Sequence, residues 1–197
     1  MSDYATLQAD VKSAMGRTDI PSYVYRLATA TINQECRLLE MQAETTLSAA
    51  ASVALPSDFL EMESVYIDVS NSRRALMPTT EQTQAQTHSN TGMPRTYAIH
   101  DGELTLSPGP DDSYTLTVRY YARLSDLSAG VDTNDVLTRH PALYLYAALT
   151  HAAVWAKDSE AAGVYAQMFQ GEVARAKKAD VSRRMGPTLR PQVVRGF

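Results

Sequence analysis

The four histidines are the first side chains that could do chemistry, because an imidazole can act as a general base or as a metal ligand. His140 and His151 are eleven residues apart, which returns to the same face of a helix. At 1.5 Å per residue they would still lie about 16 Å apart along the axis, too far to share one ion. His88 lies in a stretch rich in Gln and Thr, and His100 precedes a turn. We therefore expect surface or capping histidines, with no metal site and no cofactor.

The acidic residues offer little more. Carboxylate pairs such as Asp58 and Glu61 lie among turn residues, where acids accept local hydrogen bonds. An EF-hand loop that starts at Asp126 would need glycine at position six and glutamate at position twelve, but Val131 and Leu137 stand there. The chain has no phosphate-binding glycine loop and no G-x-S-x-G motif. We predict that the protein is not an enzyme; a cryptic hydrolase is the alternative, for which the sequence supplies no constellation.

Cys36 is the only cysteine, so an intrachain disulfide is not possible. It falls in the apolar run of a predicted helix, which favours a buried, inert thiol in a reducing compartment. The first residues lack the basic and apolar regions of a secretory signal. The most apolar helix has about 16 residues, which is too short to span a bilayer. We expect a cytoplasmic product without a membrane partner.

Residues 1–44 are predicted to be helical. Ser2 or Asp3 can cap a helix that runs to Met15, and Gly16 ends it. A second helix is expected from Pro21 to Met41, with an apolar side formed by Tyr23, Leu27, Ala30, Cys36, Leu38 and Met41.

Residues 45–131 are predicted to form an inserted β-rich domain. Apolar side chains alternate with small or polar ones from Leu47 to Leu55, from Val65 to Val69 and from Tyr114 to Tyr120, which is the period of a strand. Asp101-Gly102 suits a type I′ hairpin turn. That turn would bring four side chains onto one buried face: Tyr97, Ile99, Leu104 and Leu106.

Residues 132–185 are predicted to be helical again, and the stretch from Pro141 to Ala156 is the most informative part. Apolar side chains surround its whole circumference, and only Thr150 and His151 interrupt them. Such a helix must be buried on nearly every side, either in a core or between subunits. The eleven tyrosines, against three phenylalanines, favour an interface but also suit a core. The side chains of this helix that we expect at a subunit interface are Tyr144, Tyr146, Ala147, Ala148 and Trp155.

The last predicted helix opens at Ser159, after a short helical segment capped by Asp132, Thr133 or Asn134. Its apolar side would comprise Ala162, Tyr165, Ala166, Phe169, Val173 and Ala176. The order of helices, strands and helices predicts an α+β protein, in which the terminal helices form a helical bundle with an inserted antiparallel β domain.

An extended C-terminal tail, residues 186–197, completes the predicted organisation. Residues 171–197 carry a net charge of +5 and the remainder −9, so the end of the chain resembles an interaction arm. Val193, Val194 and Phe197 suit an arm that orders on a partner. Two simpler interpretations stay open: Arg183 and Arg184 favour the dipole at a helix end, and the tail has no role.

Four segments, in this order, resemble the adaptor, or head–tail connector, proteins of tailed bacteriophages. They are L-P-S-D-F-L-E-M-E-S-V at 55–65, G-M-P-R-T-Y-A-I-H-D-G-E-L-T-L-S-P at 92–108, Y-T-L-T-V-R-Y-Y-A-R-L-S-D-L at 114–127 and T-N-D-V-L-T-R-H-P-A-L-Y-L-Y-A-A-L-T-H-A-A at 133–153. The likeness extends from about Leu55 to Met185. It departs from the family at Asp135-Val136, where bulkier apolar residues are usual.

The resemblance implies a structural virion protein that assembles in the host cytoplasm. Adaptor subunits form a ring, usually of twelve, below the portal protein; the ring extends the channel for genomic DNA and offers a platform for a downstream tail or nozzle protein. An acidic body suits such a channel, because phosphate affinity comes from basic side chains. The C-terminal segment of such adaptors reaches into the portal, and the matching residues here are Arg183, Arg184, Leu189, Arg190, Val193, Val194, Arg195 and Phe197.

Two other functions stay open. One is another phage neck or tail-completion protein, although the helix–β–helix order argues against a tail terminator. The other is a small nucleic-acid-binding protein that acts through its basic C-terminal tail, which predicts DNA affinity with a steep salt dependence.

Overall fold

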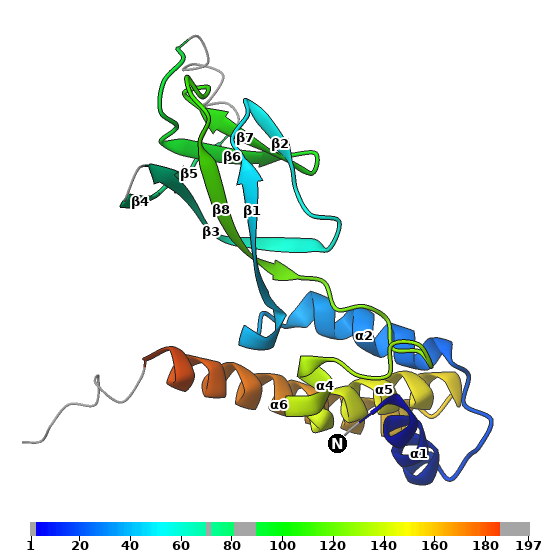
Figure 1. Cartoon of the computed structure of the whole chain (residues 1–197). Coiled ribbons are helices and arrows are strands. Elements are labelled where there is room, and N and C mark those ends of the chain that lie inside the picture. Colours follow the sequence, from blue (N-terminus) through cyan, green and yellow to red (C-terminus); the bar gives the residue numbers. More distant parts are fainter. Residues whose placement is uncertain (1–2, 70–71, 81–89, 186–197) are drawn as a thin grey trace, which may run out of the picture. The chain divides into compact units, whose positions relative to one another are not determined.

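The chain folds into an α+β protein of two compact units, seen here in a computed structural model that describes residues 3–69, 72–80 and 90–185. The β unit comprises Gln42–Arg123, and the helical unit is built from the described residues on either side of it (Figure 1). Each unit has its own core. Among the described residues, no helix is both long enough and apolar enough to cross a bilayer.

Helix α1 (Tyr4–Met15) begins and ends as its sequence predicts. The backbone N–H of Thr6 donates to the Asp3 carboxylate at 2.7 Å, which satisfies one of the free donors at the helix start. Gly16 closes the helix with φ 61°, a left-handed conformation that glycine adopts without steric cost.

Helix α2 (Tyr23–Glu35) is shorter than the predicted helix from Pro21 to Met41. The chain becomes extended at Cys36 and then forms a short 3-10 helix, η1 (Leu39–Met41). The Arg37 guanidinium donates to the carbonyl oxygens of Asn33 and Cys36, which satisfies acceptors at the end of α2.

The predicted apolar side of α2 is partly wrong. Tyr23 and Leu27 are 41% and 40% exposed, whereas the buried positions are Val24, Tyr25, Ala28, Thr29, Ile32 and Asn33. Two polar residues are buried because they find partners. Asn33 forms two hydrogen bonds with the backbone of Leu124, at 3.1 Å and 2.9 Å, and Thr29 donates to the carbonyl of Tyr25.

Helix α5 (Pro141–Trp155) lies among the other helices of its unit. It contacts α1, α2, α4 (Asp135–Arg139) and α6 (Ser159–Met185) (Figure 1). Asn134 caps α4 by accepting from the Leu137 N–H at 2.8 Å. Pro141 opens α5 in the first turn, where no N–H donor is needed. Burial by four neighbours explains why α5 is apolar all round.

Helix α6 buries the side that its sequence predicts. Phe169, Val173 and Ala176 are buried, and Ala162, Tyr165 and Ala166 are partly buried. The same face continues to Asp180, a carboxylate that is buried near the C-terminal end of the helix. A buried carboxylate requires partners, and the Leu39 N–H and the Arg183 guanidinium supply them.

The β unit consists of two four-stranded sheets that pack on a common core. One has the order β1-β8-β3-β4 and the other β2-β7-β6-β5, and all pairs are antiparallel except β5 with β6. The strands are β1 (Gln42–Ser48), β2 (Ser52–Ala54), β3 (Phe59–Val69), β4 (Ser72–Ala75), β5 (Met77–Pro78), β6 (Thr96–His100), β7 (Glu103–Ser107) and β8 (Thr115–Ala122). The shared core includes Val65, Ile67, Leu104, Leu106, Leu116 and Val118.

Two chain paths pass from one sheet to the other. The predicted strand from Leu47 to Leu55 is divided between the two sheets. The Ala49 N–H donates to the carbonyl oxygen of Tyr114, next to β8, whereas the Ala51 carbonyl accepts from the N–H of Leu106 in β7. At the opposite side the Leu76 N–H donates to Val65 and the Met77 N–H to Arg95. The sheets are thus joined at both corners, which leaves few exposed strand edges.

The hairpin of β6 and β7 confirms the predicted turn and register. Asp101 and Gly102 both have positive φ, 49° and 80°, as a type I′ turn requires. Tyr97 faces Leu106 and Ile99 faces Leu104. Ile99, however, is exposed rather than buried. Within the described part of the chain, β5 pairs only with the first two residues of β6, so the edge of β6 beside Ile99 has no neighbouring strand there.

Candidate functional site

Three of the five side chains expected at a subunit interface lie inside the helical unit. Tyr144, Ala147 and Ala148 are fully buried by the chain's own helices. The Tyr144 hydroxyl accepts a hydrogen bond from the Asn134 amide at 2.8 Å, which ties α5 to the cap of α4. These three residues therefore serve as core, and this corrects their expected placement at a subunit interface.

The other two expected interface residues are partly exposed. Tyr146 is half-buried, and the half-buried Trp155 is covered on one face by the Arg17 guanidinium, 4.7 Å from the ring centroid. Val154, in the last turn of α5, is exposed, as are Tyr23 and Leu27 of the neighbouring α2. Apolar surface is thus available on α2 and α5, although mostly at other positions than expected.

Leu189, Arg190, Val193, Val194, Arg195 and Phe197 lie outside the described residues, so the structure says nothing of the expected docking tail. Arg183 and Arg184 are described, in the last turn of α6. Arg183 does not merely favour the helix dipole: its guanidinium is paired with two carboxylates of the helical unit, Glu40 and Asp180.

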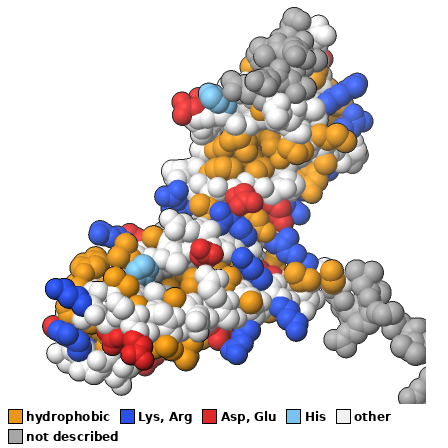
Figure 2. Space-filling view, turned by 180° about the vertical axis from the view of Figure 1, so that it is seen from behind, with side chains coloured by type: hydrophobic (Ala, Val, Ile, Leu, Met, Phe, Trp, Pro, Cys, Tyr) orange, Lys and Arg blue, Asp and Glu red, His pale blue; other side chains and the backbone are white. Residues whose placement is uncertain are grey.

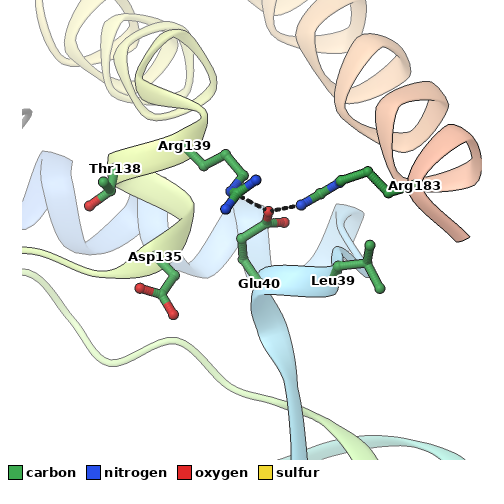
Figure 3. A pocket seen from close by; sticks show the side chains of 6 residues that line it. All are labelled: Leu39, Glu40, Asp135, Thr138, Arg139 and Arg183. Carbon is green, nitrogen blue, oxygen red and sulfur yellow. Dashed lines mark hydrogen bonds and ion pairs between the residues drawn. The ribbon is translucent and has the colours of Figure 1, made fainter.

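Those pairs belong to a group of five charged or titratable side chains, the Glu40 cluster: Glu40, Arg139, His140, Asp180 and Arg183. Figure 3 shows Glu40 between Arg139 and Arg183. The Glu40 Oε1 lies 2.7 Å from Arg183 Nη1 and 2.9 Å from Arg139 Nε. One oxygen of a carboxylate whose side chain is 5% exposed thus holds two guanidinium groups from different helices.

Asp180 connects the same cluster to the backbone of η1. Its Oδ2 accepts a hydrogen bond from the Leu39 N–H at 2.7 Å, and its Oδ1 binds Arg183. Since Glu40 lies in η1, Arg139 at the end of α4 and Asp180 in α6, the cluster fastens the C-terminal part of α6 to η1 and to the junction of α4 and α5.

A pocket of about 330 Å³ opens beside the cluster. Its walls are Leu39, Glu40, Asp135, Thr138, Arg139 and Arg183 (Figure 3). Thr138 is the one hydroxyl of this lining, and it already donates to the Asn134 carbonyl at 3.0 Å. The lining offers ion-pairing groups rather than a nucleophile beside a base.

The electrostatics of the cluster keep Glu40 ionised. Burial alone would raise the pKa of Glu40, but the hydrogen bond and charge of Arg183 outweigh it, and the pKa lies below its ordinary value. The same carboxylate raises the pKa of Arg183. A depressed carboxylate pKa stabilises the fold above the pKa of the unfolded chain, and this contribution is lost as the pH falls through the folded pKa.

Two polar atoms of the cluster have no hydrogen-bond partner among the residues that the structure describes. Glu40 Oε2 and His140 Nε2 are both buried and face each other at 3.7 Å, which is beyond hydrogen-bond distance. Glu40, His140 and Asp180 together offer three ligand atoms that all lie within 4.8 Å of one another.

Sequence reasoning missed the Glu40 cluster because its members lie near positions 40, 140 and 180. The sequence signals were weak: a buried-face aspartate on α6 and a His-Pro pair between two helices. The remaining histidines behave as expected in part. His151 shares a 2.8 Å hydrogen bond with Thr31, His100 is exposed beside the hairpin turn, and His88 lies outside the described residues.

Cys36 is fully buried, and burial raises the pKa of its thiol to about 11. A thiol with such a pKa is protonated at neutral pH and is a poor nucleophile. This agrees with the inert thiol that its sequence context predicts.

Surface charge gives no continuous basic track on the face seen in Figure 2. Basic and acidic side chains are mixed there over the helical unit, while hydrophobic side chains gather on the β unit.

The fold defines an α+β protein in which a β unit is inserted between the two parts of a helical unit. The chain belongs to the SU10 adaptor protein family, whose model matches residues 2–193 and so extends over both units. It is a phage structural adaptor and a component of the virion. No curated protein matches the chain by sequence.

Proposed function

We propose that this protein is a subunit of an adaptor ring below the portal, which joins the DNA-filled head to the tail and extends the DNA channel. The observation that carries the proposal is the family match over residues 2–193, which takes in the helices, the inserted β unit and most of the C-terminal segment. A ring of about twelve subunits, closed by head-to-tail contacts, is the assembly we expect.

Ring contacts would use apolar side chains that the fold leaves exposed. Tyr146 and Trp155 stay in this proposal, joined by Val154, which is 62% exposed, and by Tyr23 and Leu27 of α2. Aromatic and aliphatic side chains at the centre of an interface contribute most to its affinity. Tyr144, Ala147 and Ala148 would act indirectly, by holding α5 in place.

The C-terminal segment would dock into the portal through Leu189, Arg190, Val193, Val194, Arg195 and Phe197. Arg183 would have a different task, because its guanidinium is paired with Glu40 and Asp180. We propose that it anchors the end of α6, from which the docking segment continues.

The deciding experiment combines electron microscopy with a truncation. Portal incubated with the full-length protein should show an added ring of density, and deletion of residues 188–197 should abolish it while the circular dichroism spectrum stays unchanged. A truncated protein that still binds portal normally would refute the docking role. The matched control is the double substitution Val164→Ser and Met168→Ser on exposed positions of α6, which should leave portal binding intact.

The nucleic-acid alternative can be tested on the same samples. If the basic segment binds DNA, the full-length protein should be retained on immobilised DNA at low salt and released steeply as salt rises. We expect no retention, because the family match over residues 2–193 favours a structural adaptor.

A further inference from the structure

We propose that Glu40, His140 and Asp180 form a zinc-binding site that fastens the C-terminal part of α6. This proposal is independent of the adaptor role, since it depends only on contacts within the helical unit.

Two facing atoms of the Glu40 cluster have no hydrogen bond among the described residues. Glu40 Oε2 and His140 Nε2 are buried and 3.7 Å apart, which is close enough for an ion pair but too long for a hydrogen bond. Buried polar atoms are nearly always hydrogen-bonded or bound to an ion, so these two facing atoms need a common partner. A tetrahedral ion with bonds of about 2.0–2.2 Å sets its ligand atoms about 3.3–3.6 Å apart, close to the observed separation.

Asp180 is the third donor, and its chemistry also suits zinc. The Asp180 carboxylate places an oxygen within 4.8 Å of the other two ligand atoms, and its side chain is 6% exposed. One imidazole nitrogen with two carboxylate oxygens is a donor set that suits zinc.

Arg139 and Arg183 repel zinc by their positive charge, but they do not occupy the atoms that would bind it. Arg139 and Arg183 bind Glu40 through Oε1, which leaves Oε2 available. Arg183 also binds Asp180 Oδ1, while Oδ2 accepts the Leu39 N–H and keeps a second lone pair. Ligating carboxylates are commonly held by such outer hydrogen bonds. With two carboxylates balanced by two guanidinium groups, we expect a site of moderate affinity.

The test is a calorimetric titration of the chelator-treated full-length protein with zinc chloride at neutral pH. One zinc ion per chain should bind, with a rise in the thermal unfolding temperature. His140→Gln and Glu40→Gln should each weaken binding by at least about tenfold. His100→Gln and Cys36→Ala, which remove other zinc-binding groups, should bind as the wild type does.

Two further measurements keep the proposal decidable if the Glu40 variant folds poorly. X-ray absorption of the wild-type zinc complex should show nitrogen and oxygen ligands only, at about 2.0–2.2 Å. Arg183→Gln should bind zinc more tightly, because it removes a positive charge beside Glu40 and Asp180. Absence of saturable binding by the wild type, sulfur in the ligand shell, or undiminished binding by His140→Gln would each overturn the site.

Discussion

Glu40 is the residue on which the charged cluster of the helical unit depends. Its nearly buried carboxylate pairs with both Arg139 and Arg183, so loss of its charge would remove a counter-charge from both arginines at once. Removing one partner of a buried ion pair destabilises the fold far more than replacing both partners by apolar residues, because the remaining charge is left buried without a counter-charge.

The Glu40→Gln substitution should lower the free energy of unfolding by about 2 kcal/mol, since the side chain keeps its shape and loses its charge. The full cost of a buried pair is not reached because both arginines are partly exposed. Chemical denaturation at neutral pH measures this loss. The matched control is Glu172→Gln, which breaks a pair with the exposed Arg175 and should cost less than about 0.5 kcal/mol.

The pH dependence of the stability of wild type and Glu40→Gln provides a second check on the role of the Glu40 charge. The pKa of Glu40 is lowered in the fold, so its stabilisation is present above the unfolded value of 4.5 and disappears as the pH falls through the folded pKa. The stability difference between wild type and Glu40→Gln should therefore be constant near neutrality and shrink in acid. A difference that grows on acidification would contradict the ion-pair explanation.

His151 should make the fold less stable in acid, whereas a histidine paired with a carboxylate would stabilise it. Burial lowers its pKa below 6.5, because the charged imidazolium is poorly solvated beside Thr31. The unfolded chain then takes up the proton first, so protein stability should fall as the pH drops below about 6.5. A two-dimensional NMR titration of the imidazole should place its midpoint below 6.5, and a midpoint above 6.5 would disprove the effect of burial.

At the scale of elements, α5 is the helix around which the helical unit is built. It contacts four other helices, and its small residues permit that packing because alanine lets neighbouring helices approach closely. The exposed side of α5 is narrow: Val154 is its only strongly exposed large apolar residue among those described.

A charge inside α5 should therefore unfold the helical unit rather than only disturb assembly. Ala148→Glu places a carboxylate at a fully buried position on a helix without lysine or arginine, and we expect a loss of more than about 3 kcal/mol. Circular dichroism and thermal unfolding measure it. Val154→Glu on the same helix is the control and should leave the unfolding temperature nearly unchanged, although it should weaken ring formation if Val154 is in the proposed contact.

At the scale of the whole molecule, the chain has two separate cores. Leu104 belongs to the core of the β unit and Leu143 to that of the helical unit, and both are buried. Since stability is not uniform across a structure, each unit can open without the other.

Hydrogen exchange should reveal this independence. Leu104→Ala should cost about 2–5 kcal/mol and raise amide exchange within residues 42–123, because it leaves a cavity between the two sheets. Leu143→Ala should raise exchange in the helices and spare the strands. A uniform rise across both units in either variant would show that they unfold as one cooperative body.

Features that depend on neighbours along the chain could be predicted from the sequence. The caps of α1 at Asp3 and Gly16, the turn at Asp101-Gly102, the burial of α5 and the apolar side of α6 follow from local hydrogen bonding and from the 3.6-residue and two-residue periods. The order of motifs also carried the family, which the match over residues 2–193 confirms.

Only the tertiary structure decided which surfaces meet. The buried face of α2 includes Asn33 because Leu124, 91 residues away, satisfies its amide. The strand expected from Leu47 to Leu55 divides because its two ends pair with different sheets. The Glu40 cluster unites side chains that are about 140 positions apart. Polar burial depends on a partner's place in space, and no periodicity along the chain encodes it.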